Sequence, residues 1–212
     1  MPNATSGLGF DRASVHRSTY EAIISAVPLA QVVMVTHRMG LDLAPAASAL
    51  AGAEVELVPL ARREHRLAVA LATLQDRYDY VLIDCPPSLG LLTVNALAAA
   101  QGVLVPIQCE YLALEGLSRL VDSIRLVREG VNPGLRLAGI VMTMYDSRTN
   151  LSAQVVQEVA SHFPREIFRT IVPRSIRLSE APSYGKTILE YDPASRGASA
   201  YRALAEELLA RG

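Results

Sequence analysis

Residues 80–85 read Y-V-L-I-D-C, and two prolines, Pro86 and Pro87, follow them directly. Apolar side chains on consecutive positions are typical of a strand that is buried on both faces of a parallel sheet. The prolines should end this strand, because they cannot donate hydrogen bonds to a β-ladder. The stretch therefore predicts a buried strand that carries a carboxylate, Asp84, at its carboxyl end.

Further apolar runs alternate with segments of helical periodicity. Strands are expected at residues 103–109, 137–144 and 168–173, with a weaker candidate beginning at Leu41. Helices are expected at residues 60–75, 89–100, 112–128, 151–163 and 198–210, the second of them apolar all round and therefore largely buried. This alternation predicts an α/β fold, a mainly parallel sheet with helices on both faces.

Composition indicates a globular protein. The chain has 212 residues, of which 50% are hydrophobic and 19% charged, and residues 1–212 are expected to form a single domain. Its net charge of −1 excludes global basicity, so any nucleic-acid site has to be a local patch. No apolar run approaches the roughly 18–20 residues that span a bilayer, and the first ten residues do not resemble a secretory signal. We expect a cytoplasmic protein.

The two cysteines, Cys85 and Cys109, each end an apolar run and are too far apart for a C-x-x-C pair. They cannot build a zinc site alone, and we expect buried free thiols.

Polar residues fall at the predicted strand ends. In parallel sheets the ligand crevice lies outside the carboxyl ends of the strands. The residues at or just past such ends are Asp84, Gln108, Glu110, Thr143, Asp146 and Arg174. A polar residue at a strand end often only caps the strand or the next helix, so a ligand-binding role and a capping role both remain open.

Asp84 follows four apolar residues, which is the pattern expected of a Walker-B carboxylate. Mg²⁺ prefers oxygen ligands and keeps several waters, so one carboxylate beside the phosphates suffices. The prolines that follow predict a rigid segment next to a bound phosphate.

A phosphate-binding loop of the form G-x-x-x-x-G-K-[ST] would complete such a site. The chain contains G-K-T at Gly185, Lys186 and Thr187, but Glu180 stands where the first glycine is required. The segment also does not lead from a strand into a helix. Lys186 is the only lysine in the chain, so we interpret this G-K-T as unrelated to phosphate binding.

Arg148 and Arg177 each lie in a predicted loop just past a strand, where a guanidinium could reach a DNA phosphate. Solvated or ion-paired surface arginines are the alternative. The last helix, at 198–210, has a polar face of mixed charge, which favours packing on the sheet over lying on a membrane.

Several longer segments resemble the ParA/Soj family of chromosome- and plasmid-partitioning ATPases. They are residues 78–97, 108–117 (Q-C-E-Y-L-A-L-E-G-L), 143–151 (T-M-Y-D-S-R-T-N-L), 172–186 and 191–198, and the opening N-A-T-S-G-L-G is similar too. The resemblance covers essentially the whole chain.

Membership would imply a P-loop NTPase-like fold with a deviant Walker-A motif, and binding of ATP and Mg²⁺. It would also imply a homodimer formed around two nucleotides, non-specific DNA binding on the nucleoid, and a ParB-type centromere-binding protein that stimulates hydrolysis. The resemblance places the Walker-B carboxylate, catalytic and metal-binding, at Asp84. It places the adenine surroundings at Thr143, Met144 and Pro173, and the DNA contacts at Arg148 and Arg177.

The family's opening strand, its K-G-G-V-G-K-T-T loop, the next helix and a second strand ending in D-x-D-P-Q do not occur in the 212 residues. We therefore interpret the chain as the larger, C-terminal part of such an ATPase and expect it to be inactive alone, because phosphoryl transfer depends on positioning and electrostatics. We also expect apolar sheet edges to be exposed. Two alternatives are a short product that binds DNA or a homologue without ATPase activity, and a MinD-like cell-division ATPase bound to the membrane through its last helix.

Overall fold

The computed structural model describes residues 3–74, 76–86, 88–111 and 113–211. The chain forms two compact units. The N-terminal unit comprises Met1–Ala100 and Glu129–Pro133, and the C-terminal unit comprises Gln101–Arg128 and Gly134–Gly212. Each unit has its own hydrophobic core.

The C-terminal unit is built on a parallel sheet of β3 (Gly102–Gln108), β4 (Arg136–Tyr145) and β5 (Ile167–Pro173), in the order β3-β4-β5. Gln108 pairs with Thr143, and Tyr145 pairs with Pro173. The carboxyl ends of all three strands therefore lie at one edge of the sheet. This confirms the strands predicted at 103–109, 137–144 and 168–173.

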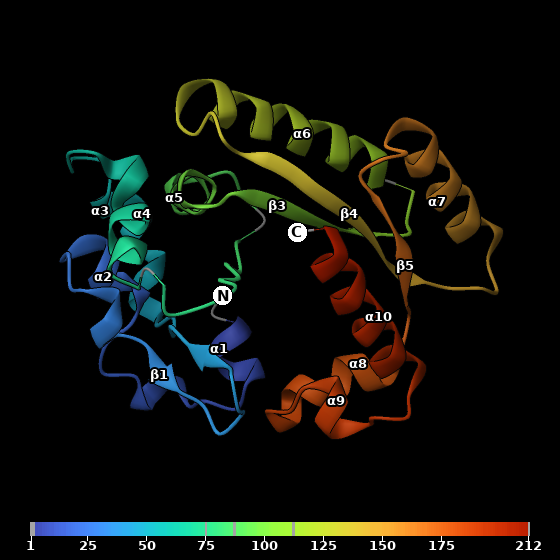
Figure 1. Cartoon of the computed structure of the whole chain (residues 1–212), viewed down its shortest axis with the longest axis horizontal. Coiled ribbons are helices and arrows are strands. Elements are labelled where there is room, and N and C mark those ends of the chain that lie inside the picture. The colour runs from blue at the N-terminus through green and yellow to red at the C-terminus, as the bar shows by residue number, and fades with distance from the viewer. Residues whose placement is uncertain (1–2, 75, 87, 112, 212) are drawn as a thin grey trace. The chain divides into compact units, whose positions relative to one another are not determined.

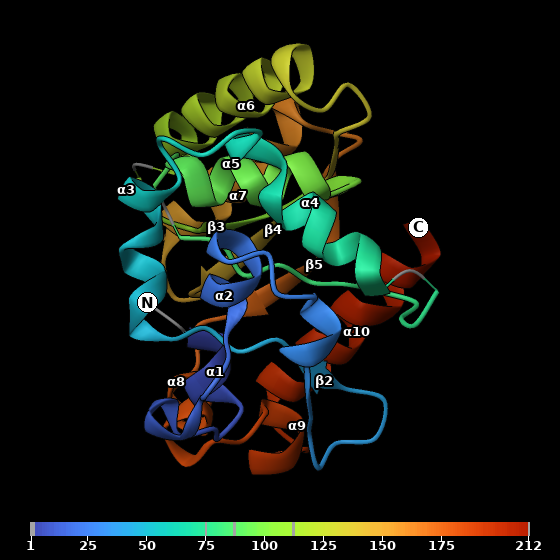
Figure 2. The same ribbon diagram turned by 90° about the vertical axis from the view of Figure 1, so that its left-hand side faces the viewer.

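Helices cover both faces of this sheet. Figures 1 and 2 show α6 (Ala113–Gly130) and α7 (Asn150–His162) on one face and α10 (Arg196–Arg211) on the other. The predicted helices at 112–128, 151–163 and 198–210 are thus confirmed to within a few residues at their ends. Two short helices, α8 (Ile176–Glu180) and α9 (Ile188–Tyr191), connect β5 to α10.

The core of this unit lies between α10 and the sheet. Leu204 and Leu208 of α10 pack against Val141 and Phe168, which are 2% exposed. A side chain at Gly139 would collide with the Phe168 ring, so glycine is required there. The stripe of leucines on α10 is used in packing, as its periodicity predicts.

Glu207 of α10 satisfies the outer edge of β5. Its carboxylate accepts hydrogen bonds from the backbone N–H groups of Arg169 and Thr170, both at 2.9 Å, and from the guanidinium of Arg211 at 2.8 Å. Partial burial alone would raise the pKa of Glu207, but these hydrogen bonds hold it at about 2. An edge strand that offers unpaired N–H groups would invite pairing with another chain, and here a side chain takes the place of that partner.

Arg211, one turn further along α10, also hydrogen-bonds to the outer edge of β5. Its guanidinium donates to the carbonyl oxygens of Glu166 at 3.2 Å and Ile167 at 2.8 Å, and lies 3.9 Å from the centre of the Phe168 ring. Glu207 and Arg211 together supply an acceptor and a donor to the same strand edge.

The N-terminal unit is mostly helical. Its longer helices are α2 (Thr19–Ile24), α4 (Arg66–Leu71) and α5 (Leu91–Ala99), and its shorter ones are α1 (Asn3–Gly7) and α3 (Ala53–Glu56). Single 3₁₀ turns lie at Arg12–Ser14, Leu29–Gln31, Ser48–Ala51, Arg63–His65 and Ala72–Leu74, and β1 (Met34–Val35) pairs with β2 (Asp42–Leu43) in an antiparallel ribbon.

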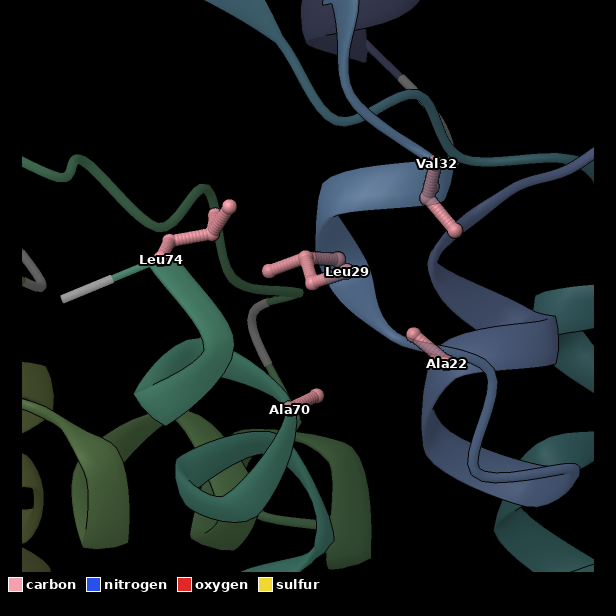
Figure 3. Packing of buried hydrophobic residues seen from close by; sticks show 5 residues of the cluster. All are labelled: Ala22, Leu29, Val32, Ala70 and Leu74. Atoms are coloured by element: carbon pink, nitrogen blue, oxygen red, sulfur yellow. The ribbon is translucent and has the colours of Figure 1, made fainter. Parts of the chain in front are cut away.

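Two apolar clusters hold this unit together. Figure 3 shows the first, in which Ala22 of α2 and Ala70 of α4 face a group completed by Leu29, Val32 and Leu74. The second joins Ile23, Leu57, Leu67 and Ala96.

Asn95 links α5 to α4 and is fully buried. Its Oδ1 accepts from the Leu67 N–H at 3.1 Å, and its Nδ2 donates to the carbonyl oxygens of Arg63 at 2.7 Å and Leu91 at 2.8 Å. A buried amide costs little only when it is hydrogen-bonded in this way. The expectation of a largely buried helix at 89–100 is met by α5, in which Thr93, Asn95, Ala96 and Leu97 are buried.

The predicted strand at 80–85 is wrong for this structure. The segment is not paired with any described strand, and Tyr80, Val81 and Leu82 are 55%, 52% and 83% exposed. Apolar composition favours a strand but does not form one, because a strand needs a neighbour for its backbone N–H and C=O groups.

Two other predictions also fail in part. The weak strand expected from Leu41 amounts to the two residues of β2. The helix predicted at 60–75 is shortened to α4 and two 3₁₀ turns, because Arg62 adopts a left-handed backbone (φ 52°) that a continuous helix cannot contain. Three boundary residues of predicted segments, Gln75, Pro87 and Leu112, lie outside the described residues.

Glu207→Gln should destabilise the protein by about 1–3 kcal/mol at neutral pH, because a charge-assisted acceptor is lost. The folded-state pKa is lowered from 4.5 to about 2, so the contribution is present above pH 4.5 and is lost as the pH falls through about 2. Thermal unfolding of wild type and variant should therefore converge at acid pH. Glu206→Gln, on the same helix, serves as the control; a constant difference at every pH would contradict the assignment.

Candidate functional site

A pocket of about 290 Å³ lies at the carboxyl edge of the sheet. Its walls come from the ends of β3, β4 and β5 and from residues on or beside α8 and α10. They are Pro106, Gln108, Thr143, Met144, Val172, Pro173, Ser175, Leu178, Ser179 and Tyr201. The structure thus brings together the three residues that the family resemblance places around an adenine: Thr143, Met144 and Pro173.

The backbone at the mouth of this pocket is unusual. Met144 has φ 55°, a left-handed conformation that non-glycine residues rarely adopt and that is often found at functional sites. The Thr143 hydroxyl donates to the Ile107 carbonyl at 3.0 Å, and the Arg174 N–H donates to the Tyr145 carbonyl at 2.9 Å. These bonds hold the three strand ends in place.

The lining combines apolar side chains with a few hydroxyl groups. Pro106, Val172 and Pro173 give apolar contact, while Ser175 and Ser179 add hydroxyl groups. Apolar walls with a few placed polar groups are the usual composition of a small-molecule site.

Asp84 belongs to the N-terminal unit, whereas this pocket belongs to the C-terminal unit. Its side chain is exposed, and within the described residues it has no hydrogen-bond or ion-pair partner. A carboxylate in this state can bind a hard cation. No group of three or more His, Cys, Asp or Glu side chains in the described part of the chain could hold a metal by itself, so Asp84 would share a cation with water and phosphate oxygens.

The segment after Asp84 is anchored at the start of α5 by a carboxylate from another helix. Glu54 of α3 accepts from the Leu91 N–H at 2.7 Å and the Leu92 N–H at 3.2 Å. A side chain at Gly90 would collide with this carboxylate. Negative charge at a helix N-terminus is favourable, and here it also ties the end of the Asp84 segment to α3.

Sequence reasoning missed Glu54. The signal was present: Gly90 precedes α5 and has no side chain with which to cap it, so the first N–H groups of the helix need an acceptor from elsewhere. Which carboxylate supplies it depends on tertiary packing.

Arg148 lies in the turn between β4 and α7 and is held by Asp146. Its Nε donates to Asp146 Oδ1 at 2.9 Å and its Nη2 to Oδ2 at 2.7 Å. These hydrogen bonds hold the pKa of the Asp146 carboxyl well below its usual range. The Arg148 side chain is 84% exposed, so another anion can approach its guanidinium from solvent.

Arg177, on α8, has two carboxylate neighbours. Its Nη1 donates to Glu180 Oε2 at 3.3 Å, and its Nε lies 3.7 Å from Asp192 Oδ2. Its guanidinium also lies 6.0 Å from the centre of the Tyr191 ring. Both predicted DNA-contacting arginines are therefore exposed and ion-paired in this structure.

The other polar residues at strand ends differ in their surroundings. Gln108 lines the pocket with Thr143. Glu110 is exposed, and its N–H donates to the Gln108 carbonyl at 2.8 Å. The Arg174 side chain is exposed as well, so these two residues follow the strands without lining the pocket.

The G-K-T segment is part of a turn, as its context predicts. Gly185 has φ 63° and ends a 3₁₀ turn at Ala181–Tyr184. Thr187 caps α9, because its hydroxyl oxygen accepts from the Glu190 N–H at 3.4 Å, and its own N–H donates to the Glu190 carboxylate at 2.8 Å. The segment does not lead from a strand into a helix.

The cysteines differ from each other. Cys109 is 4% exposed, and burial raises the pKa of its thiol to about 11, so it is the buried neutral thiol that its position predicts. Cys85 is exposed, contrary to prediction, because the apolar segment that contains it is not covered by a sheet.

Two sequence families match the chain. One is described as an AAA domain and matches residues 2–137; the other, described as 4Fe-4S iron sulfur cluster binding proteins of the NifH/frxC family, matches residues 71–211. Similar proteins include the sporulation initiation inhibitor protein Soj of Bacillus subtilis, 50% identical over 210 residues, which are 99% of this chain and 83% of that protein. The chromosome partitioning protein ParA of Myxococcus xanthus is 52% identical over 209 residues, 99% of this chain and 74% of ParA.

The chain belongs to the Soj/ParA family of partitioning ATPases. Among solved structures, cobyrinic acid a,c-diamide synthase from Mycobacterium smegmatis with bound ADP and magnesium superposes with a TM-score of 0.82 at 38% identity. The match covers 97% of this chain and 76% of the synthase. The P-loop ATPase fold expected from the resemblance is thus confirmed.

The iron–sulfur description of the second family is not reflected in the state of Cys109. A cluster is held by cysteine thiolates, whereas Cys109 is 4% exposed and burial raises the pKa of its thiol to about 11.

Glu54→Ala should leave the Leu91 and Leu92 N–H groups without their acceptor and lower the free energy of unfolding by about 0.5–2 kcal/mol. Faster amide exchange at the start of α5 should accompany the loss, because the helix end is freed. Urea unfolding and hydrogen exchange measure the two effects, with exposed Glu206→Ala as control. Unchanged exchange at residues 91 and 92 would show that another group caps the helix.

Proposed function

We propose that this chain provides the adenine pocket, the Mg²⁺-binding carboxylate and the DNA-contacting arginines of a ParA-type partitioning ATPase. The observation that carries the proposal is the pocket at the carboxyl edge of the sheet, which Thr143, Met144 and Pro173 line together. The family membership of the chain gives the pocket its ligand class.

The nucleotide is an adenine nucleotide with Mg²⁺. A relative of known structure, 38% identical, has ADP and magnesium bound, and the pocket of this chain has the apolar walls and hydroxyl groups that suit a base. In this proposal Asp84 contributes the Walker-B carboxylate, through water or directly. Mg²⁺ supplies neutralisation of phosphate charge when bound, and the pocket residues bind and orient the base.

DNA would bind to Arg148 and Arg177 through its phosphates and without regard to sequence. Both side chains are exposed on the C-terminal unit. Because Asp146, Glu180 and Asp192 pair with them, a phosphate has to displace a carboxylate before it gains an arginine contact. DNA affinity should therefore be set by these acidic neighbours as well as by the arginines.

The assembly proposed is that of the family. It is a homodimer around two nucleotides, located in the cytoplasm on the nucleoid, and stimulated by a ParB-type protein. That residues 1–212 act as one domain remains a prediction. The membrane-bound alternative is disfavoured by α10, whose Leu204 and Leu208 already pack on the sheet. Among the described helices none is long and apolar enough to cross a bilayer.

Adenosine should bind the pocket weakly, with a dissociation constant of about 1 mM or lower, and should shift the methyl resonance of Met144 in a ¹³C NMR titration. Ser179→Trp should fill the pocket from its exposed rim and weaken binding about tenfold, whereas Ser161→Trp, on an exposed face of α7, should leave it unchanged. Adenosine that shifts other methyl groups but not Met144 would place the base elsewhere.

Arg148→Ala and Arg177→Ala should each weaken binding to duplex DNA and reduce the slope of log affinity against log salt by about 1. Asp146→Asn should have the opposite effect, because it keeps an acceptor for the Arg148 N–H while removing the competing charge. Fluorescence anisotropy over a salt series measures both, with Arg128→Ala on α6 as control. An Asp146→Asn protein that binds no better than wild type would show that the ion pair does not compete with DNA.

A further inference from the structure

A second pocket, of about 360 Å³, lies in the N-terminal unit between α2 with its following turn and α4. Its floor is formed by Ala22 and Ala70, which are 2% and 5% exposed and belong to the core cluster of Figure 3. Because both floor residues are alanines, an apolar groove remains open above the core. Val69, 55% exposed, stands at its rim.

Two strained residues line this groove. Ala26, in the turn after α2, has φ 55°, and Arg62, before α4, has φ 52°. A left-handed backbone costs a non-glycine residue about 1–2 kcal/mol. Such strain persists where the surrounding structure enforces it and is concentrated at binding sites. The turns that form the two sides of the groove are therefore both held in unfavourable conformations.

The charged groups of the groove are arginines. Arg66 is fixed in place, since its Nε donates to the Ile23 carbonyl and its Nη2 to the Ile24 carbonyl, both at 2.8 Å. The Arg62 side chain is exposed, and among the described residues its guanidinium has no hydrogen-bond or ion-pair partner. Among the described residues that line the groove none is Asp or Glu, so the charged groups of its lining are positive and stand above an apolar floor.

We propose that this groove binds one face of an acidic amphipathic helix from a partner protein. Apolar side chains at helical spacing would enter the groove over Ala22 and Ala70 beside Val69, and a carboxylate would pair with Arg62. This is the helix-in-groove mode of recognition, in which apolar anchors give affinity and charge complementarity gives orientation. The groove belongs to the N-terminal unit, whereas the proposed nucleotide pocket and both predicted DNA-contacting arginines belong to the C-terminal unit.

The apolar floor of the groove makes DNA an unsuitable occupant. A nucleic-acid surface gains affinity from many phosphate contacts, whereas here the lining is mostly apolar and has two arginines. Burial of apolar side chains is the contribution that such a groove offers.

The test uses a fluorescein-labelled synthetic helix with leucines at positions i, i+3, i+4 and i+7 and glutamates on its flanks. Anisotropy should detect its binding to the full chain. A matched peptide with lysine in place of glutamate should bind at least tenfold more weakly. Decanoate and anionic phosphatidylglycerol vesicles test the other amphiphilic anions as occupants, and neither should compete with the peptide.

Two variants change exposed residues at the rim of the groove and leave the buried core residues unchanged. Val69→Glu should weaken binding at least tenfold, and Ala61→Trp, which fills the groove, should do the same. Arg62→Asn should weaken it about fivefold without straining the backbone, because asparagine tolerates the left-handed region. Leu126→Glu and Arg128→Asn on α6 are the matched controls and should bind as wild type does.

Unchanged circular dichroism and unfolding midpoints would show that each variant is folded. Equal binding of the acidic and basic peptides would overturn the proposal, and so would binding that survives Val69→Glu and Ala61→Trp together. A dissociation constant above about 1 mM for the acidic peptide would also overturn it, as would tighter binding of decanoate or vesicles than of the peptide.

Discussion

The register of the parallel sheet is the constraint on which the pocket at the carboxyl edge of the sheet depends. Gln108 pairs with Thr143, and Tyr145 pairs with Pro173, so three segments distant in sequence end at the same edge. A slip of one residue would turn the side chains of a strand to the opposite face and would remove Thr143 from the pocket. The edge of β5 is in turn held by Glu207, whose carboxylate occupies N–H groups that a fourth strand would otherwise use. The pocket therefore depends on backbone pairing more than on any single lining residue.

Sequence reasoning succeeded where a segment finds its partner within the chain. The periodicities of 103–109, 137–144 and 168–173 predicted the strands that form, because each has a neighbour to accept its hydrogen bonds. The run at 80–85 has a similar apolar composition but forms no strand. Composition belongs to a single segment, whereas strand pairing requires a second segment beside it. The interruption before α4 also escaped prediction. It rests on the left-handed backbone of Arg62, and arginine carries no local signal for that conformation.

The residues of the candidate site also fall into those that could be predicted from the sequence and those that could not. The pattern of strand ends predicted Thr143, because parallel strands bring such ends together, whereas Met144 and Pro173 were placed by the family resemblance; all three line the pocket at the sheet edge. Glu54 could not be placed, because nothing in its own neighbourhood indicates that it caps α5 from 37 residues away. The ion pairs of Arg148 and Arg177 were foreseen only as a general possibility for surface arginines. Their carboxylate partners turn two positive side chains into nearly neutral pairs, which agrees with the net charge of −1 of the chain.

Residues with a strained, left-handed backbone line both pockets. Among the described residues, four without glycine's freedom have positive φ: Ala26, Arg62, Asp76 and Met144. Met144 lines the pocket at the sheet edge, and Ala26 and Arg62 line the groove of the N-terminal unit. Glycine or asparagine at these positions would relieve the strain. Retaining methionine and arginine there keeps an apolar side chain over one pocket and a guanidinium over the other. Both side chains stand where a bound ligand would contact them, which supports the binding roles proposed for the two surfaces.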